Sequence, residues 1–260
     1  HRQASGDPES LFQIGVAHEL GVAMQYSPYL ASYFYRNASE KGHVAAMYEY
    51  GRCLMHGIGP KQDEFKGLEL IAKSAEEGYV PALLHYGLCL ESGEGTGKPP
   101  DPHNAVFCLQ QAMEAGYPQA YYHVGRGYAE GVMYPKNVKR AEDLFLKAAN
   151  LGVPQAMYSL GNLYRDGDGL KRDPTKAAKM YKLAADKGHP SAMYNLGICY
   201  MNGFGVQQDR SEALWWFIKA GYRPKSFESS EDDEKELKDY IAKKDTEDPK
   251  GWKGWGVRQQ

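Results

Sequence analysis

The chain has 260 residues, of which 42% are hydrophobic and 25% charged, which is the composition of a folded protein. A mean hydropathy of −0.61 and the lack of an apolar run of about 18 residues exclude a membrane span, so no direct membrane insertion is predicted. The formal net charge of −2 gives no basic field to attract nucleic acid, and no nucleic-acid partner is predicted.

Glycine recurs along the chain at a nearly constant spacing. The intervals of the first series are 36, 36, 38, 36 and 36 residues: Gly15, Gly51, Gly87, Gly125, Gly161 and Gly197. A second series runs in step with it: Gly42, Gly78, Gly116, Gly152 and Gly188. The two-residue excess falls in the Gly- and Pro-rich stretch 93–102, as is typical of an insertion in a surface loop. The period predicts six repeats of about 36 residues.

Each repeat reads as a first helix (helix A), a Gly-containing turn, a second helix (helix B) and a glycine stop. The expected starts are near Ser10, Ala46, Ala82, Ala120, Ala156 and Ala192. In the fifth repeat, helix A is broken at Gly167-Asp168-Gly169, and helix B runs from about Pro174 to Lys187 before Gly188 ends it. The first repeat departs from this pattern, with Gly21-Val22-Ala23 at the turn.

Helix B carries one apolar stripe. In the fifth repeat, Ala177, Met180, Tyr181 and Ala184 stand at offsets 0, 3, 4 and 7, so the helix must bury this face on a neighbour. Helices of about 12 residues are not stable alone, and stacking of successive pairs supplies the core. The chain is therefore predicted to be an all-α solenoid of six helix-turn-helix repeats.

The glycine in the middle of each helix A is costly, because glycine in a helix interior is about 1 kcal/mol less favourable than alanine. Six such positions indicate that close approach of two helices compensates the loss. Alanine at Gly161 is therefore expected to clash with the neighbouring helix.

The fifth repeat identifies a family. Its Ala156-Met-Tyr-Ser-Leu-Gly-Asn-Leu-Tyr164, Gly-Asp-Gly turn, Asp173-Pro174 start and Lys-Ala-Ala-Lys-Met-Tyr-Lys-Leu-Ala-Ala-Asp-Lys-Gly-His end resemble the Sel-one-like repeat, a relative of the tetratricopeptide repeat. The residues from Ala192 to Gly205 and from Glu212 to Ala220 match equally well, and the resemblance covers roughly residues 8–221.

The resemblance implies a right-handed superhelix whose A helices line a concave groove. It also implies a non-catalytic scaffold or adaptor for proteins, a structural or assembly subunit of a larger complex. No catalytic motif and no cofactor are expected, because the Gly-x-Gly turns follow helices and not strands, unlike phosphate-binding loops. The alternatives are a haem-, metal- or small-ligand-binding assembly factor, or an enzyme activator, on the same fold.

Helical spacing separates two sides of helix A. Counted from the opening small residue, positions 2, 5 and 9 point one way, and seventeen of these eighteen residues are apolar or aromatic. Positions 4, 7 and 11, here called the polar face, point the other way, and fourteen of these eighteen residues are polar. The residues predicted to bind a partner are Glu49, Arg52, His56, His85, Ser92, His123, Arg126, Glu130, Ser159, Asn162, Asp166, Asn195 and Asn202.

The polar face varies between repeats, as expected of a surface that meets solvent or a partner. Charge reversal at Arg52, Arg126 and Glu130 is expected to weaken partner binding without loss of stability. His85 and His123 occupy the same position in adjacent repeats, with His56 nearby, and they are the candidates for the alternative haem or metal site. No carboxylate or thiolate with ligand spacing joins them, so no metal is predicted.

The four cysteines are expected to be reduced and buried. Cys53, Cys89 and Cys199 occupy equivalent places in three repeats, and Cys89 with Cys108 is the one pairing that deserves a check. Some bacterial members of the resembled family hold each repeat with a disulfide, and this chain lacks those pairs. The sparse cysteines and the first residue, His1, slightly favour a mitochondrial location over a cytoplasmic one.

The end of the chain differs from the repeats, which are expected to occupy residues 8–224. An acidic segment, 225–248, contains a predicted short capping helix at 231–244. The tail, 249–260, holds Trp252 and Trp255 between glycines. These indoles are predicted to contact a partner; folding back onto the repeats is the alternative.

Overall fold

The computed structural model describes residues 6–222 together with residues 240, 242 and 243. In this part of the chain it has twelve helices and no strand. They are α1 (Pro8–Leu20), α2 (Pro28–Glu40), α3 (Val44–His56), α4 (Glu64–Glu76), α5 (Val80–Ser92), α6 (Pro102–Glu114), α7 (Pro118–Glu130), α8 (Val138–Asn150), α9 (Pro154–Asp166), α10 (Pro174–Asp186), α11 (Pro190–Asn202) and α12 (Arg210–Lys219). The protein is an all-α solenoid, as predicted. None of these helices is both long and apolar enough to cross a membrane.

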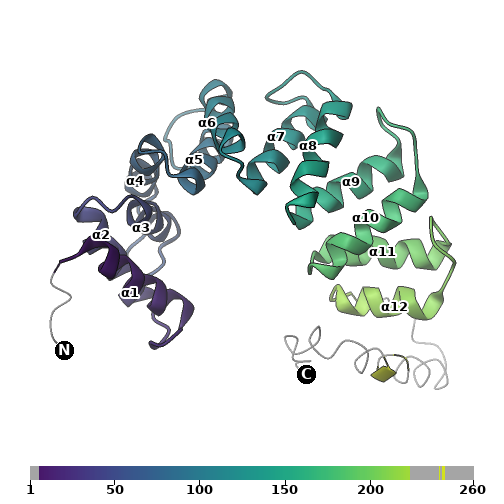
Figure 1. The fold of residues 1–260 in the computed structure, drawn as a ribbon, viewed down its shortest axis with the longest axis horizontal. Helices are drawn as coiled ribbons and strands as arrows, with labels where there is room; N and C mark the ends of the chain where they lie inside the picture. The colour runs from purple at the N-terminus through teal and green to yellow at the C-terminus, as the bar shows by residue number, and fades with distance from the viewer. Residues whose placement is uncertain (1–5, 223–239, 241, 244–260) are drawn as a thin grey trace. The chain divides into compact units, whose positions relative to one another are not determined.

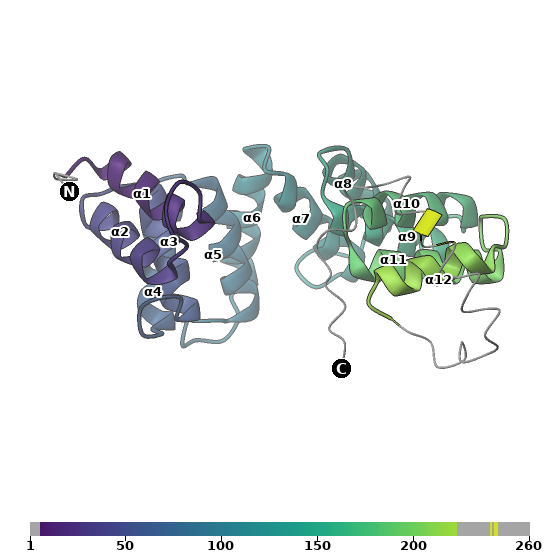
Figure 2. The same ribbon diagram turned by 90° about the horizontal axis from the view of Figure 1, so that it is seen from below.

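Helices A of the six repeats are the odd-numbered helices and helices B the even-numbered ones (Figure 1). The chain divides into two compact units, residues 1–144 and 145–260, and the division falls inside α8. Within the first unit each of the helices α1 to α6 packs on the helix that follows it, which makes an unbroken series up to α7. Within the second unit α9 packs on α10, α10 on α11 and α11 on α12. Figure 2 shows the helices of each unit side by side. The handedness of the superhelix and its concave face stay predictions.

The helix boundaries follow from local chemistry. All six A helices begin two residues earlier than the small residue that opens the sequence pattern. In α1, α7, α9 and α11 proline stands at the start, where its missing N–H costs nothing. The B helices start at side chains that accept a backbone N–H, as Asp173 does from Lys176 at 2.9 Å. As predicted, Gly188 ends α10, with φ 85°. The N–H of the next residue, His189, donates to the Ala184 carbonyl.

The turn after helix A needs a second left-handed residue in most repeats. Gly59, Gly95, Gly169 and Gly205 supply it with positive φ, and Ala23 adopts φ 59° at the same place in the first repeat. Ala23 is the one non-glycine residue with positive φ in the described part of the chain, and this conformation is strained for alanine. The fourth repeat also departs, since Met133 stands there without a positive φ.

Mid-helix glycines let several of the helices A, among them α3, α9 and α11, approach their own helices B. A Cβ placed on Gly161 would lie 2.4 Å from the ring of Tyr181, and one on Gly197 would lie 2.7 Å from the ring of Phe217. Gly51 approaches the backbone itself, because its Cβ would lie 2.7 Å from the carbonyl oxygen of Gly67. The predicted clash at Gly161 is therefore confirmed.

All four cysteines are free and buried, and the prediction of reduced thiols is confirmed. Burial raises the pKa of the Cys53 thiol to about 11 and that of the Cys89 thiol to about 12. The thiols therefore remain protonated near neutral pH and are poor nucleophiles or metal ligands.

The last helix meets one residue of the acidic segment. The Tyr240 hydroxyl donates to Glu212 of α12, whose other carboxylate oxygen accepts from Trp216 Nε1 at 3.0 Å. Residues 240, 242 and 243 are helical, and the rest of the capping helix predicted at 231–244 lies outside the described residues, so this helix stays a prediction. The tail with Trp252 and Trp255 also lies outside them.

Candidate protein-binding face

The two sides of helix A differ in burial as the sequence pattern indicates. No residue at positions 2, 5 or 9 is exposed, and Leu160 and Leu196 are fully buried. At position 11 every residue is exposed: Leu20, His56, Ser92, Glu130, Asp166 and Asn202. At positions 4 and 7 most side chains are half-buried, including Glu49, Arg52, His85, His123, Arg126, Ser159, Asn162 and Asn195. The polar face is thus open at its C-terminal end and partly covered elsewhere.

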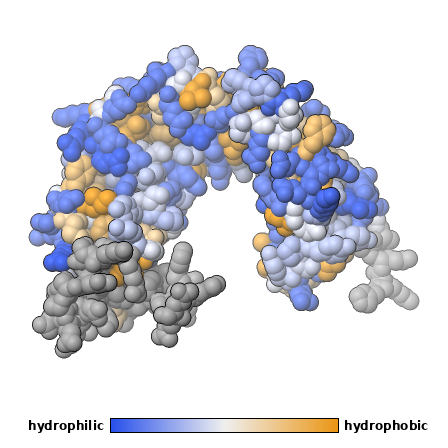
Figure 3. Space-filling model, turned by 180° about the vertical axis from the view of Figure 1, so that it is seen from behind, coloured by the Kyte–Doolittle hydropathy of each residue, from blue (hydrophilic) through white to orange (hydrophobic). Residues whose placement is uncertain are grey.

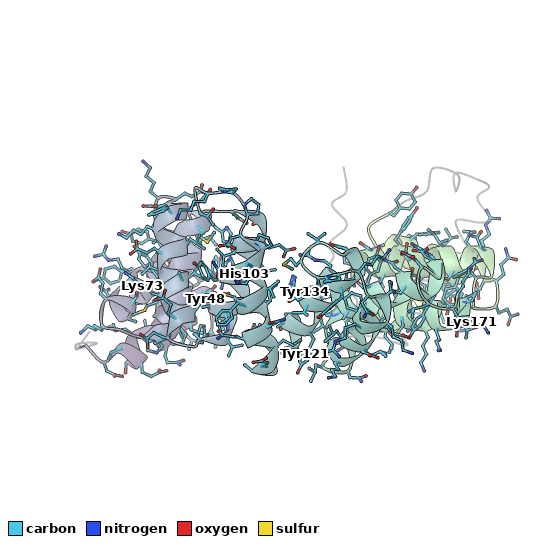
Figure 4. All side chains as sticks on the ribbon, turned by 90° about the horizontal axis from the view of Figure 1, so that it is seen from above. Tyr48, Lys73, His103, Tyr121, Tyr134 and Lys171 are labelled. Atoms are coloured by element: carbon cyan, nitrogen blue, oxygen red, sulfur yellow. The ribbon has the colours of Figure 1, made fainter. Side chains whose placement is uncertain are left out.

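In the first unit, the polar face of α3 is neutralised by its own charges. Arg52 Nη1 lies 2.5 Å from Glu49 Oε2, and the Arg52 guanidinium lies 5.9 Å from the Tyr48 ring centroid. Burial raises the pKa of Glu49, and the Arg52 cation opposes this shift. Tyr48 (Figure 4) also meets the ring of His85 on α5, with centroids 5.8 Å apart.

A second ion pair joins α5 to α7. Arg126 Nη2 donates to both carboxylate oxygens of Glu91, at 2.7 and 2.9 Å, and both side chains are mostly covered. The pair connects residues 35 apart in the chain, so it connects two repeats. Charge reversal at Arg126 would place two carboxylates at this contact, so the structure argues against the expectation that such a change leaves stability unaffected. Glu130, exposed and at the end of α7, still fits that expectation.

Burial favours the neutral form of two of the candidate histidines, His85 and His123. Burial lowers the pKa of His123 to about 4, and the neighbouring Arg126 cation lowers it further. Burial, Arg52 and His56 likewise lower the pKa of His85. In the described part of the chain, His123 Nδ1 and Arg126 Nε are buried without a hydrogen-bond partner. No group of three His, Cys, Asp or Glu side chains placed for a metal ion occurs among the described residues.

In the second unit the polar face contains an open pocket of about 520 Å³. It is lined by Arg165, Asp166, Arg172, Tyr181, Asn195, Ile198, Cys199, Asn202 and Phe204. Asp166, Asn195 and Asn202 were predicted binding residues, and the structure brings them together across α9 and α11. Asn162 does not line the pocket, but its Oδ1 accepts from the hydroxyl of the lining residue Tyr181 at 2.7 Å. Ser159 is half-buried and does not line the pocket.

The charges around this pocket are fixed by short contacts. Arg165 donates to both oxygens of Asp166, at 2.7 and 2.9 Å, and this contact lowers the pKa of Asp166. Arg172 Nε donates to the Arg165 carbonyl at 3.1 Å and its guanidinium lies 5.2 Å from the Phe204 ring centroid. Two arginines and one aspartate leave the lining with one positive charge in excess. Burial raises the pKa of Cys199 to about 11, so its thiol supplies no nucleophile here.

Sequence reasoning missed the aromatic residues at position 3 of helix A. They are Phe12, Tyr48, Tyr122, Tyr158 and Tyr194. Several stack on the residue that precedes the next helix A: Phe12 on His43 at 4.6 Å and Tyr158 on His189 at 4.7 Å between centroids. Their recurrence in five of six repeats was a visible signal, and in the first, second and fifth repeats the aromatic residue packs one repeat against the next.

These features define a class, the helical-repeat proteins that present a variable face on a repeated core. The chain belongs to the Sel1 repeat family. The model of the Sel1 repeat matches residues 8–43, 44–79, 80–117, 118–153, 154–189 and 190–223. Sel1 repeat proteins generally act as protein–protein interaction scaffolds.

Solved structures agree with this assignment. A Sel1 repeat protein from Oxalobacter formigenes is 24% identical, with a TM-score of 0.77 over 87% of this chain and 88% of that one. A protective antigen of uropathogenic Escherichia coli strains, displaying an SLR fold, is 26% identical with a TM-score of 0.70. That match covers 84% of this chain but only 46% of the antigen. An immunity protein from Pseudomonas aeruginosa, 20% identical with a TM-score of 0.54 over 95% of this chain and 85% of that one, shares the fold alone. Comparison with curated proteins found no match.

Proposed function

We propose that this protein is a non-catalytic scaffold that holds a partner protein on the polar face of α9 and α11, as a structural or assembly subunit of a larger complex. The pocket of about 520 Å³ across these helices is the observation that carries the proposal. It combines amide side chains, which form hydrogen bonds without regard to charge, with the apolar Ile198 and Phe204. This mixture suits an inserted protein side chain and its backbone.

The first unit supports the same choice, because its polar face is built on ion pairs, whereas the pocket adds Asn195, Asn202 and Ile198 to its own Arg165–Asp166 pair. The first unit has two ion pairs, Glu49 with Arg52 and Glu91 with Arg126, in which the charged groups already bind each other. A partner would have to break them before it could use these side chains, which costs desolvation and Coulomb energy. The open end of this face, with His56, Ser92 and Glu130, and the tail residues Trp252 and Trp255 are proposed as secondary contacts.

The experiment is co-purification from the native source, followed by mass spectrometry, with wild type and a variant in which the pocket is filled. Asn195→Arg places a long cation in the pocket, where Arg165 and Arg172 already leave an excess of positive charge. Its matched control, Thr175→Arg, adds the same side chain at an exposed position on the neighbouring helix α10. We expect a stoichiometric partner that wild type and Thr175→Arg retain and Asn195→Arg loses.

The proposal fails if the partner remains bound to a folded Asn195→Arg protein. Titration with haem and Zn²⁺ tests the alternative ligand-binding function. Stoichiometric sub-micromolar binding that disappears in a His85→Ala, His123→Ala variant would replace the scaffold proposal with that alternative.

A further inference from the structure

The first repeat exposes an unusual number of large hydrophobic side chains. Single exposed hydrophobic residues are ordinary, and on the face drawn in Figure 3 they lie scattered among hydrophilic ones. Between residues 20 and 33, however, seven are exposed together, with exposed fractions from 38% to 68%. They form what we call the first-repeat patch: Leu20, Val22, Met24, Tyr26, Tyr29, Leu30 and Tyr33.

The patch residues lie at the end of α1, in the turn that follows it and on the first half of α2. The Ser27 N–H bonds to the His18 carbonyl at 3.0 Å, and His18 Nδ1 lies 2.9 Å from the Gln25 carbonyl oxygen. These contacts hold the turn beside the end of α1. On α2, Tyr29 and Tyr33 are one helical turn apart and Leu30 lies beside them, so the three share one side of the helix.

The other repeats serve as internal references for these positions. At the position of Leu20 they have His56, Ser92, Glu130, Asp166 and Asn202. At the position of Tyr26 they have Gln62, Pro100, Lys136, Arg172 and Gln208. At the position of Leu30 they have Lys66, Asn104, Arg140, Lys176 and Glu212. All of these except Glu212 are exposed. Only the first repeat is hydrophobic at all three positions.

This comparison shows that the patch is not a surface for stacking another repeat. The second to fifth repeats each have a repeat before them, yet their equivalent positions stay exposed and are mainly polar. The stacking side of α2 is a different one, where Ala31, Tyr35 and Ala38 are buried. Helix α2 thus has two apolar sides, and the second of them meets no other part of the described chain in a buried contact.

The patch also carries no charge. Residues 20–35 contain no Asp, Glu, Lys or Arg, whereas the equivalent stretch 130–145 contains six. Where α2 continues past the patch, Arg36 and Glu40 neutralise each other at 3.0 Å. A surface with a net charge of one sign repels a copy of itself, whereas an uncharged surface bounded by an internal ion pair does not.

We propose that the first-repeat patch is a homodimer interface, in which α2 and the preceding turn of one chain pack against the same surface of a second copy. A fully exposed residue of these types presents roughly 150–250 Å², so the patch exposes on the order of 600–1,000 Å². A typical monomer has a largest patch of roughly 300–600 Å², and a standard interface needs about 800 Å² from each partner. Tyrosine and methionine, which the patch contains, are enriched at interfaces. The dimer would present two copies of the α9–α11 pocket, but the inference does not depend on that pocket.

The test is the oligomeric state of the purified chain, measured by sedimentation equilibrium up to about 100 µM. We expect a concentration-dependent dimer. In a symmetric interface each substitution acts twice, so Tyr29→Lys with Tyr33→Lys should weaken the dimer at least about 100-fold. The matched control is Phe65→Lys with Phe107→Lys, which changes exposed aromatic residues at the same two positions in the second and third repeats. This control should dimerise like wild type.

A second measurement avoids the question of whether the lysine variants fold. Tyr33→Cys should cross-link to itself in the dimer with a short bifunctional maleimide, because the twofold axis brings the two patches together; Phe107→Cys should not. The native cysteines are buried and do not compete. A chain that stays monomeric at about 100 µM overturns the proposal, as does equal loss of the dimer in both lysine pairs. A monomer that binds phosphatidylcholine vesicles through Tyr29 and Tyr33 would assign the patch to a membrane surface instead.

Discussion

The inner and outer sides of helix A obey different constraints, and α9 shows both within four turns. On the inner side, Gly161 admits the Tyr181 ring and Tyr164 is buried, and the corresponding residues recur through the array. On the outer side, Asn162 and Asp166 have no common counterpart in the other repeats. The inner side is determined by its own helix B, which every repeat must pack in the same way. The outer side has no such requirement to pack on helix B, so its residues can differ from one repeat to the next.

Parts of the outer side, however, make contacts with other repeats. In the first unit Arg126, at position 7, pairs with Glu91 and joins two repeats, while in the second unit Ile198, at the same position, lines an open pocket. The same helical positions thus serve packing between repeats in one place and an accessible surface in another. Position in the repeat predicts the direction of a side chain, and its neighbours determine its role.

The largest effect should come from the inner side. Tyr164 is 6% exposed, and removing a large aromatic side chain from a core costs about 3–5 kcal/mol. Tyr164→Ala should lower the free energy of unfolding by this amount in urea titration. Tyr29→Ala, at a residue 68% exposed, is the control and should cost less than about 0.5 kcal/mol in monomeric protein. Equal losses would mean that the two sides do not differ.

Two glycine positions on the inner side should respond differently to substitution by alanine. A Cβ on Gly161 would lie 2.4 Å from the buried Tyr181 ring, whereas one on Gly87 would lie 3.1 Å from the Leu109 side chain. Overpacking costs about 1–3 kcal/mol, against a gain in helix propensity of about 1 kcal/mol. Gly161→Ala should therefore destabilise clearly and Gly87→Ala little. Thermal unfolding of the two variants checks this order, which a stabilised Gly161→Ala would contradict.

Much of this inner side was predictable from sequence, because glycine and small residues recur with the period of the repeat. The two extra residues of the third repeat were also predicted correctly to lie in a loop, the one between α5 and α6. The Glu91–Arg126 pair was not predictable, since it depends on the rotation of one repeat against the next. The pocket across α9 and α11 was missed for the same reason, although three of its residues had been predicted singly. Treating helix A as two-sided also hid the stacking residues at position 3.

Titration of His123 tests how far the outer side is buried in the first unit. Its pKa is about 4 in the folded protein against an ordinary 6.5, so between these values the unfolded chain binds the proton more readily. Stability should fall as the pH drops from about 6.5 towards 4, by roughly 2 kcal/mol after allowance for solvent at the half-buried ring. Urea titrations of wild type and His123→Leu over this range should show a shallower pH dependence in the variant. Parallel curves would mean that the ring is open to solvent.

The Glu91–Arg126 pair should contribute less. Its side chains are 19% and 33% exposed, between the exposed pairs that contribute up to about 1 kcal/mol and the buried pairs whose disruption costs about 3–5 kcal/mol. A double-mutant cycle with Glu91→Gln and Arg126→Met should give a coupling of about 1–2 kcal/mol. The same cycle on Arg36 and Glu40, which are 52% and 61% exposed, is the control and should give less than about 0.5 kcal/mol. Equal couplings would remove the distinction between a pair that joins repeats and an ordinary surface pair.

The smallest effect on stability should come from the exposed end of the polar face. Asn202 ends α11, lines the pocket and is exposed, so Asn202→Lys removes no buried contact and should change the free energy of unfolding by less than about 0.5 kcal/mol. The cation also suits the C-terminal turn of a helix, where the macrodipole is negative. Partner retention should nevertheless fall, because the lining already has an excess positive charge and the new side chain occupies part of the space.

Glu130→Lys is the matched control: it makes a charge change at the end of α7, outside this pocket, and should retain the partner better. Thermal unfolding together with partner co-purification separates the outcomes, because loss of binding at unchanged melting temperature is a property of a surface and not of a core. A large drop in melting temperature for Asn202→Lys would show that this end of the polar face is packed like the inner side.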